Sequence, residues 1–151
     1  TNDAASAYTR MVEMGVEPFL VASTVEAVMA QRLIRRLCTK CKESYEPDTA
    51  DLPPDFPFDR LDGPLYVNVG CRECRGTGYA GRLGIYELLV TTDEVRQLAH
   101  DRASSWKMKQ AAVKGGMLTL RDDGWRKVLA GSSTVDEVLR VTKGDQQVAK
   151  A

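Results

Sequence analysis

Four cysteines arranged as two C-x-x-C pairs are the residues of this 151-residue chain whose type and spacing could do chemistry. The first pair is Cys38 and Cys41, and the second is Cys71 and Cys74. Each pair can place two thiolates on one tight turn, and two such turns can surround one tetrahedral ion. The pattern therefore predicts a single metal site with four sulfur ligands.

Zinc is the metal that fits this predicted site best, because it is redox-silent and accepts four thiolates in tetrahedral geometry. A site closed by four protein ligands leaves no position for water or substrate, so we expect a structural ion rather than a catalytic one. The chain has four cysteines in all, so none is left over. Two disulfides and four unrelated thiols are the alternatives to this interpretation.

The overall composition gives no indication of a nucleic-acid or membrane partner. Hydrophobic residues make up 43% and charged residues 28%, which is typical of a globular protein. The 21 Lys and Arg residues balance the 21 Asp and Glu residues, and we expect no nucleic-acid partner. No apolar run approaches the ~20 residues of a membrane span, and thiols that bind metal favour a reducing compartment. We therefore expect a cytoplasmic protein, or one peripheral to a membrane through its partners.

Residues for catalysis are not evident in the sequence. It contains neither a G-x-x-x-x-G-K-[ST] phosphate loop nor a dinucleotide-binding fingerprint. The single histidine, His100, lies in a polar stretch and is expected on a helix surface rather than in an active site. Trp106 and Trp125 lie among helical apolar residues and are expected in the core. We assign no catalytic and no cofactor-binding residue, and we expect this chain alone to catalyse no reaction.

The first part of the chain is expected to form two helices and a strand. Asn2 or Asp3 can cap a helix that ends at Gly15, and the apolar residues 18–22 suit a buried strand. The sequence Ser23-Thr24-Val25-Glu26 matches a capping box that would open a helix running to residue 37. This helix would lead directly into Cys38, and its arginines would meet the negative end of its dipole. These arginines are Arg32, Arg35 and Arg36.

The sequence after the first cysteine pair predicts an irregular excursion, two strands and four helices. Residues 46–65 hold five prolines and argue for an excursion between the cysteine pairs. Residues 65–69 and 83–90 are expected to form strands. Helices are expected to begin near Thr92, Ser104 or Ser105, Leu120 and Thr134. The expected fold class is thus α+β and mostly helical. Arg32 and Arg82 flank the metal site, where they are either solvated or part of an interface or anion contact.

Six motifs occur in order along the chain: Thr1-Asn2-Asp3-Ala4, Glu17-Pro18-Phe19-Leu20, Ala30-Gln31-Arg32-Leu33, the two cysteine pairs, Gly78-Tyr79 followed by Gly81-Arg82-Leu83-Gly84-Ile85-Tyr86-Glu87, and Arg121-Asp122-Asp123-Gly124. With these motifs the chain resembles the C-terminal third of the ATPases of bacterial type II secretion and type IV pilus assembly. The resemblance runs from residue 1 to about Thr142. It does not distinguish the secretion branch from the pilus branch.

The resemblance implies a division into three parts. Residues 1–37 would end a RecA-like α/β ATPase core, residues 38–80 would form a tetracysteine zinc subdomain, and residues 81–151 would form a return strand and a helical C-terminal subdomain. Thr1-Asn2-Asp3 would be the tail of a His box whose histidine precedes this chain. We also expect that zinc holds residues 38–80 together, so that Cys71→Ser would unfold this arm and leave the flanking helices formed.

The function implied by the resemblance belongs to a longer parent protein. Members of this family form cytoplasmic hexamers that hydrolyse ATP with Mg²⁺ and drive pseudopilus or pilus growth at the bacterial inner membrane. Their partners are inner-membrane platform proteins and cytoplasmic docking proteins. This chain would supply the structural Zn²⁺ site and would itself be monomeric, while ATP and Mg²⁺ would bind in the parent protein only.

A non-enzymatic zinc-ribbon adaptor is the alternative function. Residues 71–78 match the C-x-x-C-x-G-x-G repeat of zinc-containing co-chaperones, although the first cysteine pair lacks the glycines of that repeat. A nucleic-acid-binding ribbon would normally carry a basic excess, and the charge of this chain is balanced.

Overall fold

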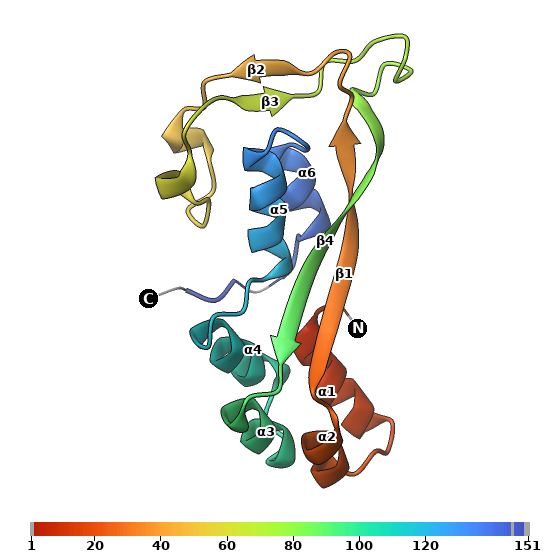
Figure 1. Cartoon of the computed structure of the whole chain (residues 1–151), viewed down its shortest axis with the longest axis vertical. Coiled ribbons are helices and arrows are strands. Elements are labelled where there is room, and N and C mark those ends of the chain that lie inside the picture. Colours follow the sequence, from red (N-terminus) through yellow and green to blue (C-terminus); the bar gives the residue numbers. More distant parts are fainter. Residues whose placement is uncertain (1, 146, 150–151) are drawn as a thin grey trace. The chain divides into compact units, whose positions relative to one another are not determined.

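The structure is a computed structural model that describes residues 2–145 and 147–149. These residues form six α-helices, four strands and two short 3-10 helices (Figure 1), which confirms a mixed α+β fold. They group into two compact units. The first contains the described parts of 1–31, 86–120 and 146–151, and the second contains 32–85 and 121–145. Among the described residues, no helix has the length and apolarity that crossing a membrane requires.

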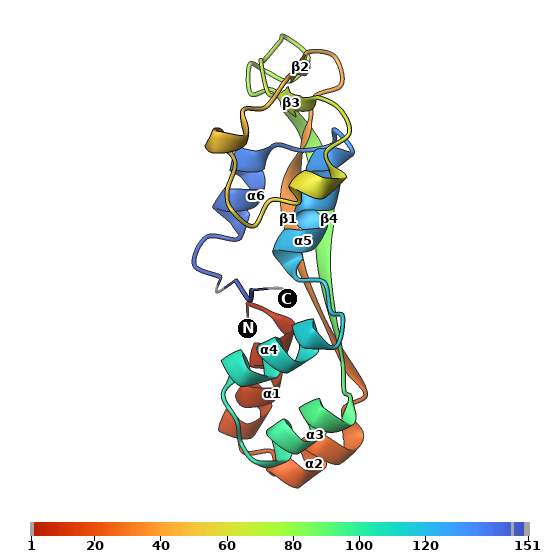
Figure 2. The same cartoon turned by 90° about the vertical axis from the view of Figure 1, so that its left-hand side faces the viewer.

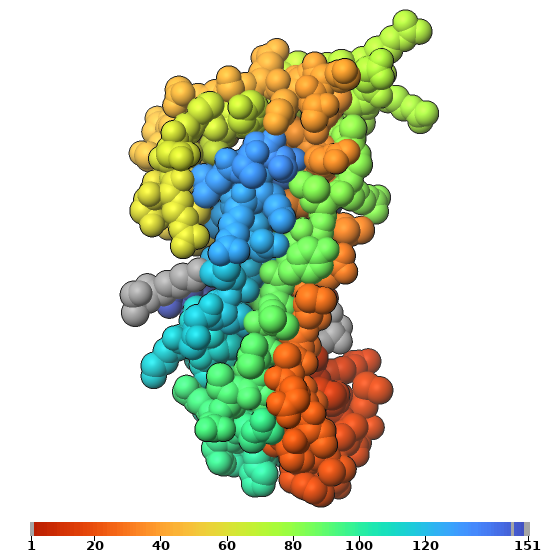
Figure 3. Space-filling view, viewed as in Figure 1, coloured from red at the N-terminus to blue at the C-terminus, as the bar shows by residue number. Residues whose placement is uncertain are grey.

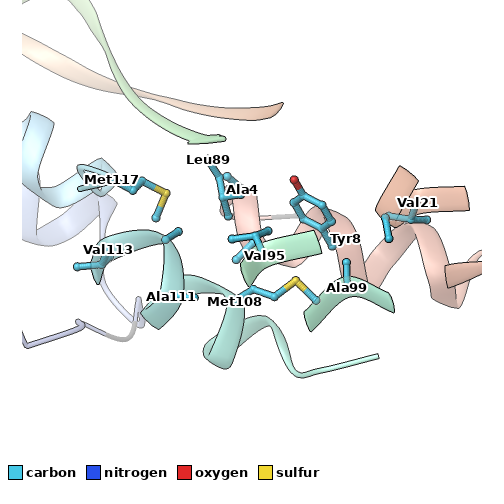
Figure 4. Packing of buried hydrophobic residues seen from close by; sticks show 13 residues of the cluster. Ala4, Tyr8, Val21, Leu89, Val95, Ala99, Met108, Ala111, Val113 and Met117 are labelled. Atoms are coloured by element: carbon cyan, nitrogen blue, oxygen red, sulfur yellow. The ribbon is translucent and has the colours of Figure 1, made fainter. Parts of the chain in front are cut away.

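The first unit is a set of four helices around one apolar cluster: α1 (Ala4–Glu13), α2 (Pro18–Thr24), α3 (Asp93–His100) and α4 (Ser105–Lys114). Figure 4 shows Tyr8, Val95 and Met108 of this cluster, all of which are buried. The Tyr8 hydroxyl lies 2.5 Å from Thr91 Oγ1, so its polar end is satisfied inside the core. The side chains that accept an N–H at the starts of α1, α3 and α4 confirm the predicted helix starts. These caps are Asp3, Thr92 and Ser104.

A buried carboxylate joins two helix starts in this unit. Glu87 is 1% exposed; its Oε1 accepts the N–H of Ala4 at 2.9 Å and its Oε2 accepts that of Leu120 at 3.2 Å. Burial raises the pKa of Glu87, while the two N–H donors and Lys109 act in the opposite direction. Glu87 thereby satisfies free backbone donors at the starts of α1 and α5 (Leu120–Leu129).

The strand predicted for residues 18–22 is wrong, because these residues begin α2. Pro18 occupies the first helical position, where its fixed φ suits a helix and its missing N–H costs nothing. The Val21 N–H bonds to the Glu17 carbonyl at 3.1 Å. A short apolar run fits a buried strand and a buried helix equally well, so periodicity could not separate them here.

The helix predicted for residues 25–37 is also wrong, because Ala27–Leu37 form strand β1. Ser23 and Thr24 of the predicted capping box instead lie at the end of α2, where the Thr24 hydroxyl donates to the Leu20 carbonyl at 2.7 Å. β1 pairs with β4 (Tyr79–Val90) in a two-stranded sheet, and the two arrows run in opposite directions in Figure 1. Pairing with a distant strand therefore overrode the local helical pattern. β4 contains the predicted strand 83–90 and begins four residues earlier than expected.

The second unit contains a small sheet and two helices. β2 (Glu43–Tyr45) and β3 (Leu65–Val67) pair antiparallel. β3 begins at residue 65, as predicted for the strand 65–69, and ends two residues earlier. α5 and α6 (Val135–Val141) lie side by side in Figures 1 and 2. A Cβ atom at Gly124 would lie 2.7 Å from Val138 Cγ1, so the close packing of these helices requires glycine there.

The proline-rich excursion between β2 and β3 is irregular, as predicted, and it is anchored to α5. It contains the 3-10 helices Thr49–Asp51 and Phe58–Arg60. The Phe56 ring packs edge-on against Trp125 with centroids 5.4 Å apart, and Trp125 Nε1 donates to Asp55 Oδ2 at 3.0 Å. Figure 3 shows the yellow residues of the excursion beside the blue residues of α5. Trp125 is buried as predicted, whereas Trp106 is half-exposed.

The arginines of β1 bind α6 and β4 and do not cap a helix of their own. Arg32 Nη1 donates at 2.8 Å to the carbonyl of Val141, the last residue of α6. Arg32 thus satisfies a free carbonyl at the C-terminal end of α6. Arg35 and Arg140 both donate to Glu137, whose side chain is 0% exposed. Arg36 Nε donates to the Ala80 carbonyl at 3.2 Å.

The Glu137 carboxylate yields a prediction for acid stability. Burial would raise the pKa of Glu137, but hydrogen bonds from Arg140 and Arg35 outweigh it and lower the pKa to about 2 from an ordinary value of 4.5. A carboxyl with a depressed folded-state pKa stabilises the fold above pH 4.5, and this contribution is lost as the pH falls toward 2. Glu137→Gln should therefore cost about 2 kcal/mol at pH 7 and progressively less toward pH 2.

Urea unfolding of both proteins across this pH range checks the prediction, because every other titrating group is common to both. Glu43→Gln, a change at an exposed position of β2, is the matched control and should leave stability within about 0.5 kcal/mol of the parent chain. A stability difference at Glu137→Gln that does not change with pH would contradict the assignment.

Candidate metal centre

The two cysteine pairs lie at the ends of strands that belong to the second unit. β1 ends at Leu37, directly before Cys38, and the Lys42 N–H closes the first turn on the Cys38 carbonyl at 3.1 Å. The second pair lies in the segment between β3 and β4, where the Gly76 N–H bonds to the Cys71 carbonyl at 2.8 Å. Each pair is therefore held on a hydrogen-bonded turn, as the spacing predicts. We call these two turns, residues 38–41 and 71–74, the knuckles.

The four sulfur atoms converge on one point. All four Sγ atoms lie within 4.8 Å of one another. The Sγ atoms of Cys38 and Cys71 are 3.9 Å apart, and those of Cys41 and Cys74 are 3.8 Å apart. A tetrahedron with Zn–S bonds of about 2.3 Å has edges of about 3.8 Å, so the spacing fits one zinc ion. All four cysteines are free thiols, which excludes the disulfide alternative in this structure.

Backbone N–H groups prepare one of these sulfurs as a ligand. Cys74 Sγ accepts N–H bonds from Cys71 and Gly78, both at 3.2 Å. These donors, led by Cys71, lower the pKa of the Cys74 thiol to about 6. Burial and the neighbouring thiols raise the pKa of Cys41. Cys38 and Cys74 are buried, whereas Cys41 and Cys71 are partly exposed.

Gly78 touches both halves of the site. Its N–H donates to Cys74 Sγ, and its carbonyl accepts the N–H of Cys38 at 2.9 Å. Its φ is +77°, and a Cβ at this position would lie 2.4 Å from Asn68 Cβ. This glycine therefore permits both the turn and the close approach of its backbone to Asn68.

Three other residues were singled out from the sequence, namely His100, Arg32 and Arg82. His100 is exposed at the end of α3, with Nδ1 3.3 Å from Asp101, as expected for a helix-surface histidine. Arg32 forms a 2.9 Å ion pair with Asp145, which shows a role within the second unit. Arg82 is exposed.

Sequence reasoning missed the polar residues that surround the metal site. Tyr79 follows Gly78, and its hydroxyl lies 2.8 Å from Thr134 Oγ1. Thr134 was predicted only as the start of a helix, and its Oγ1 does accept the Glu137 N–H at 3.1 Å. The Glu137 carboxylate, however, binds Arg35 of β1. The available signal was that Glu137 lies on the apolar side of the short helix α6, because a buried carboxylate needs a charged or hydrogen-bonding partner from elsewhere in the chain.

Comparison with known proteins gives one consistent family. Residues 1–140 match the family described as type II/IV secretion system protein. The chain is 48% identical over 143 residues to a type II secretion system protein E of Pseudomonas aeruginosa and 46% identical over 143 residues to the type II secretion system protein HxcR of the same organism. It is 45% identical over 144 residues to the type IV pilus assembly ATPase PilB of Thermus thermophilus.

The chain is much shorter than these relatives. The three alignments cover 95%, 95% and 94% of this chain. They cover only 28%, 27% and 16% of the respective relatives. The chain thus corresponds to about a quarter or less of each relative.

Because the Gly78 backbone lies so close to Asn68, a methyl group at this position should affect metal binding. Gly78→Ala should weaken zinc binding at least about tenfold, because the added Cβ displaces the backbone that bonds Cys74. Gly76→Ala is the matched control: its φ is +78°, but no atom lies within 4 Å of an added Cβ. It should carry only the conformational cost, about 1 kcal/mol.

Zinc competition against a chromophoric chelator gives both affinities. Equal affinities for the two variants would contradict a steric role for Gly78.

Proposed function

Because the chain belongs to the type II/IV secretion system protein family, we propose that it is the C-terminal portion of an ATPase that powers type II secretion or type IV pilus assembly. The observation that carries this proposal is the family match over residues 1–140. Relatives of both branches align over nearly the whole chain at similar identity, so the proposal does not choose between secretion and pilus assembly.

We assign a structural zinc ion to Cys38, Cys41, Cys71 and Cys74. The support is the tetrahedral spacing of the four sulfurs and the N–H donors to Cys74. Four thiolates close the coordination sphere, so the ion would stabilise the fold and would not bind substrate. β2 and β3 are three residues each, and a two-stranded sheet of this size is not stable without further support. Zinc would supply part of that support.

The parts of the chain would then have the roles that the family resemblance implies. Residues 1–37 would belong to a RecA-like core, residues 38–80 to the zinc subdomain, and residues 81–151 to the return strand and helical C-terminal subdomain. ATP and Mg²⁺ would bind in the parent protein, outside this chain. The parent would act as a cytoplasmic hexamer beside inner-membrane platform proteins and cytoplasmic docking proteins.

The family match favours this proposal over a zinc-ribbon adaptor. An adaptor related to the co-chaperones would share the segment 71–78, whereas the match extends over residues 1–140. It therefore includes both units of the fold and not the cysteine repeat alone.

The coding sequence upstream of Thr1 tests the proposal most directly. We expect a histidine immediately before Thr1 and a G-x-x-x-x-G-K-[ST] phosphate loop further upstream. The encoded protein should hydrolyse ATP and contain one zinc per chain by elemental analysis. A start codon near Thr1, with no nucleotide-binding motif in the frame, would refute the ATPase assignment and favour the adaptor.

The 151-residue chain by itself should be monomeric, because the proposed hexamer depends on the nucleotide-binding core. Sedimentation velocity across a hundredfold range of concentration measures this. A stable hexamer of the isolated chain would contradict the proposed origin of the assembly.

A further inference from the structure

A continuous set of contacts leads from the sulfur cluster to the first turn of α6. Gly78 bonds both knuckles through its N–H and carbonyl groups. The next residue, Tyr79, places its hydroxyl 2.8 Å from Thr134 Oγ1. Thr134 is the N-cap of α6 and accepts the Glu137 N–H. Three consecutive contacts therefore separate a metal-binding sulfur from the start of a helix.

The ring of Tyr79 is held from its face as well as from its hydroxyl. The Arg35 guanidinium lies 4.2 Å from the centre of the Tyr79 ring, a distance at which a cation attracts the ring face. The same guanidinium donates twice to the buried Glu137 carboxylate, at 2.8 and 3.0 Å. The Arg35 N–H also donates to Glu137, at 2.9 Å. Tyr79 thus lies between the knuckle that precedes it and an anchored ion pair on α6.

Two hydrogen bonds, one from a backbone N–H and one from a serine hydroxyl, join the end of β1 before the other knuckle to the turn before α6. The Leu37 N–H donates to the Ser132 carbonyl at 2.9 Å, and Ser133 Oγ donates to the Arg35 carbonyl at 2.8 Å. Cys38 directly follows Leu37. Both knuckles are therefore connected to residues 132–137, within a single compact unit.

We propose that Tyr79 is a positioning residue that couples metal occupancy of the four-cysteine site to the start of α6. A metal that fixes Gly78 also fixes the direction in which Tyr79 leaves the knuckle, and hence its contacts with Thr134 and Arg35. Coupling between two such states is reciprocal, so the contacts at Thr134 must strengthen metal binding by the factor by which the metal strengthens them. The inference rests on the zinc site of the proposed function. The sequence alone predicted that residues 38–80 form an arm that folds independently. Under this proposal the metal bound in that arm also stabilises α6.

The first test is the zinc affinity of Tyr79→Phe in the full 151-residue chain. This variant keeps the ring beneath Arg35 and removes only the hydroxyl, which lies 2.8 Å from Thr134 Oγ1 and makes a longer contact of 3.4 Å with Asn68 Oδ1. Tyr45→Phe is the matched control, since Tyr45 is a tyrosine of β2 that is 38% exposed. Competition against a chromophoric chelator should show zinc binding weakened about three- to tenfold in Tyr79→Phe, the range expected for one lost hydrogen bond. Binding by Tyr45→Phe should stay within about twofold of the parent chain.

The second test measures the reverse effect, which a hydroxyl that merely stabilised the fold would not produce. Hydrogen exchange is compared with zinc bound and after its removal by a chelator. Removal should speed exchange at the Glu137 and Val138 amides in the parent chain, and the change should be smaller in Tyr79→Phe. Amides of α1 and α4, in the other unit, serve as the internal reference and should change little.

The outcomes separate this inference from the zinc assignment. If the parent chain binds zinc, but Tyr79→Phe binds it equally well and α6 exchange does not respond to removal, the coupling is refuted and the zinc site stands. If removal speeds exchange only in β2 and β3, the arm is independent and the coupling is likewise refuted. If the parent chain binds no zinc, both are refuted.

Discussion

The convergence of four sulfur atoms is the constraint on which the second unit depends. They come from two turns that are distant in sequence, yet all four lie within 4.8 Å of one another. As thiolates they would repel at this distance unless a cation lay between them. The β2–β3 sheet beside them is only three residues long on each strand and largely exposed, so it contributes little apolar burial. The proposed metal ion would supply attraction where the small β2–β3 sheet supplies little.

Each unit also contains one buried carboxylate that binds groups distant from it in sequence. Glu87 accepts the first N–H groups of α1 and α5 in the first unit, and Glu137 accepts three donor groups of Arg35 in the second. Each costs desolvation energy, which is recovered only while its partners stay in place. The opposite pKa shifts reflect the kind of partner: backbone N–H groups do not overcome burial at Glu87, whereas two arginines do at Glu137. Both therefore favour one arrangement of segments that are distant in sequence.

The two cysteine turns and most helices could be predicted from the sequence because their signals are local. The C-x-x-C spacing, and the caps at Thr92, Ser104 and Thr134, act over three or four residues. The strand β1 could not be predicted in this way, because its partner β4 begins 42 residues after its end. Nor could Tyr79 and Glu137 be placed beside the metal site, since their partners come from other elements. Short-range patterns thus gave the knuckles, and long-range pairing determined what surrounds them.

The first knuckle and Gly78, which follows the second knuckle, are joined by a backbone hydrogen bond where β1 ends and β4 begins. Cys38 directly follows β1, Gly78 directly precedes β4, and the Cys38 N–H bonds to the Gly78 carbonyl. A slip of one residue would exchange the two faces of β4. It would expose Ile85, Glu87 and Leu89, which are at most 1% exposed, and bury Tyr86, Leu88 and Val90. Glu87 would then leave the N–H groups of Ala4 and Leu120. The bond between Cys38 and Gly78 is therefore consistent with the register in which each face of β4 has its observed burial.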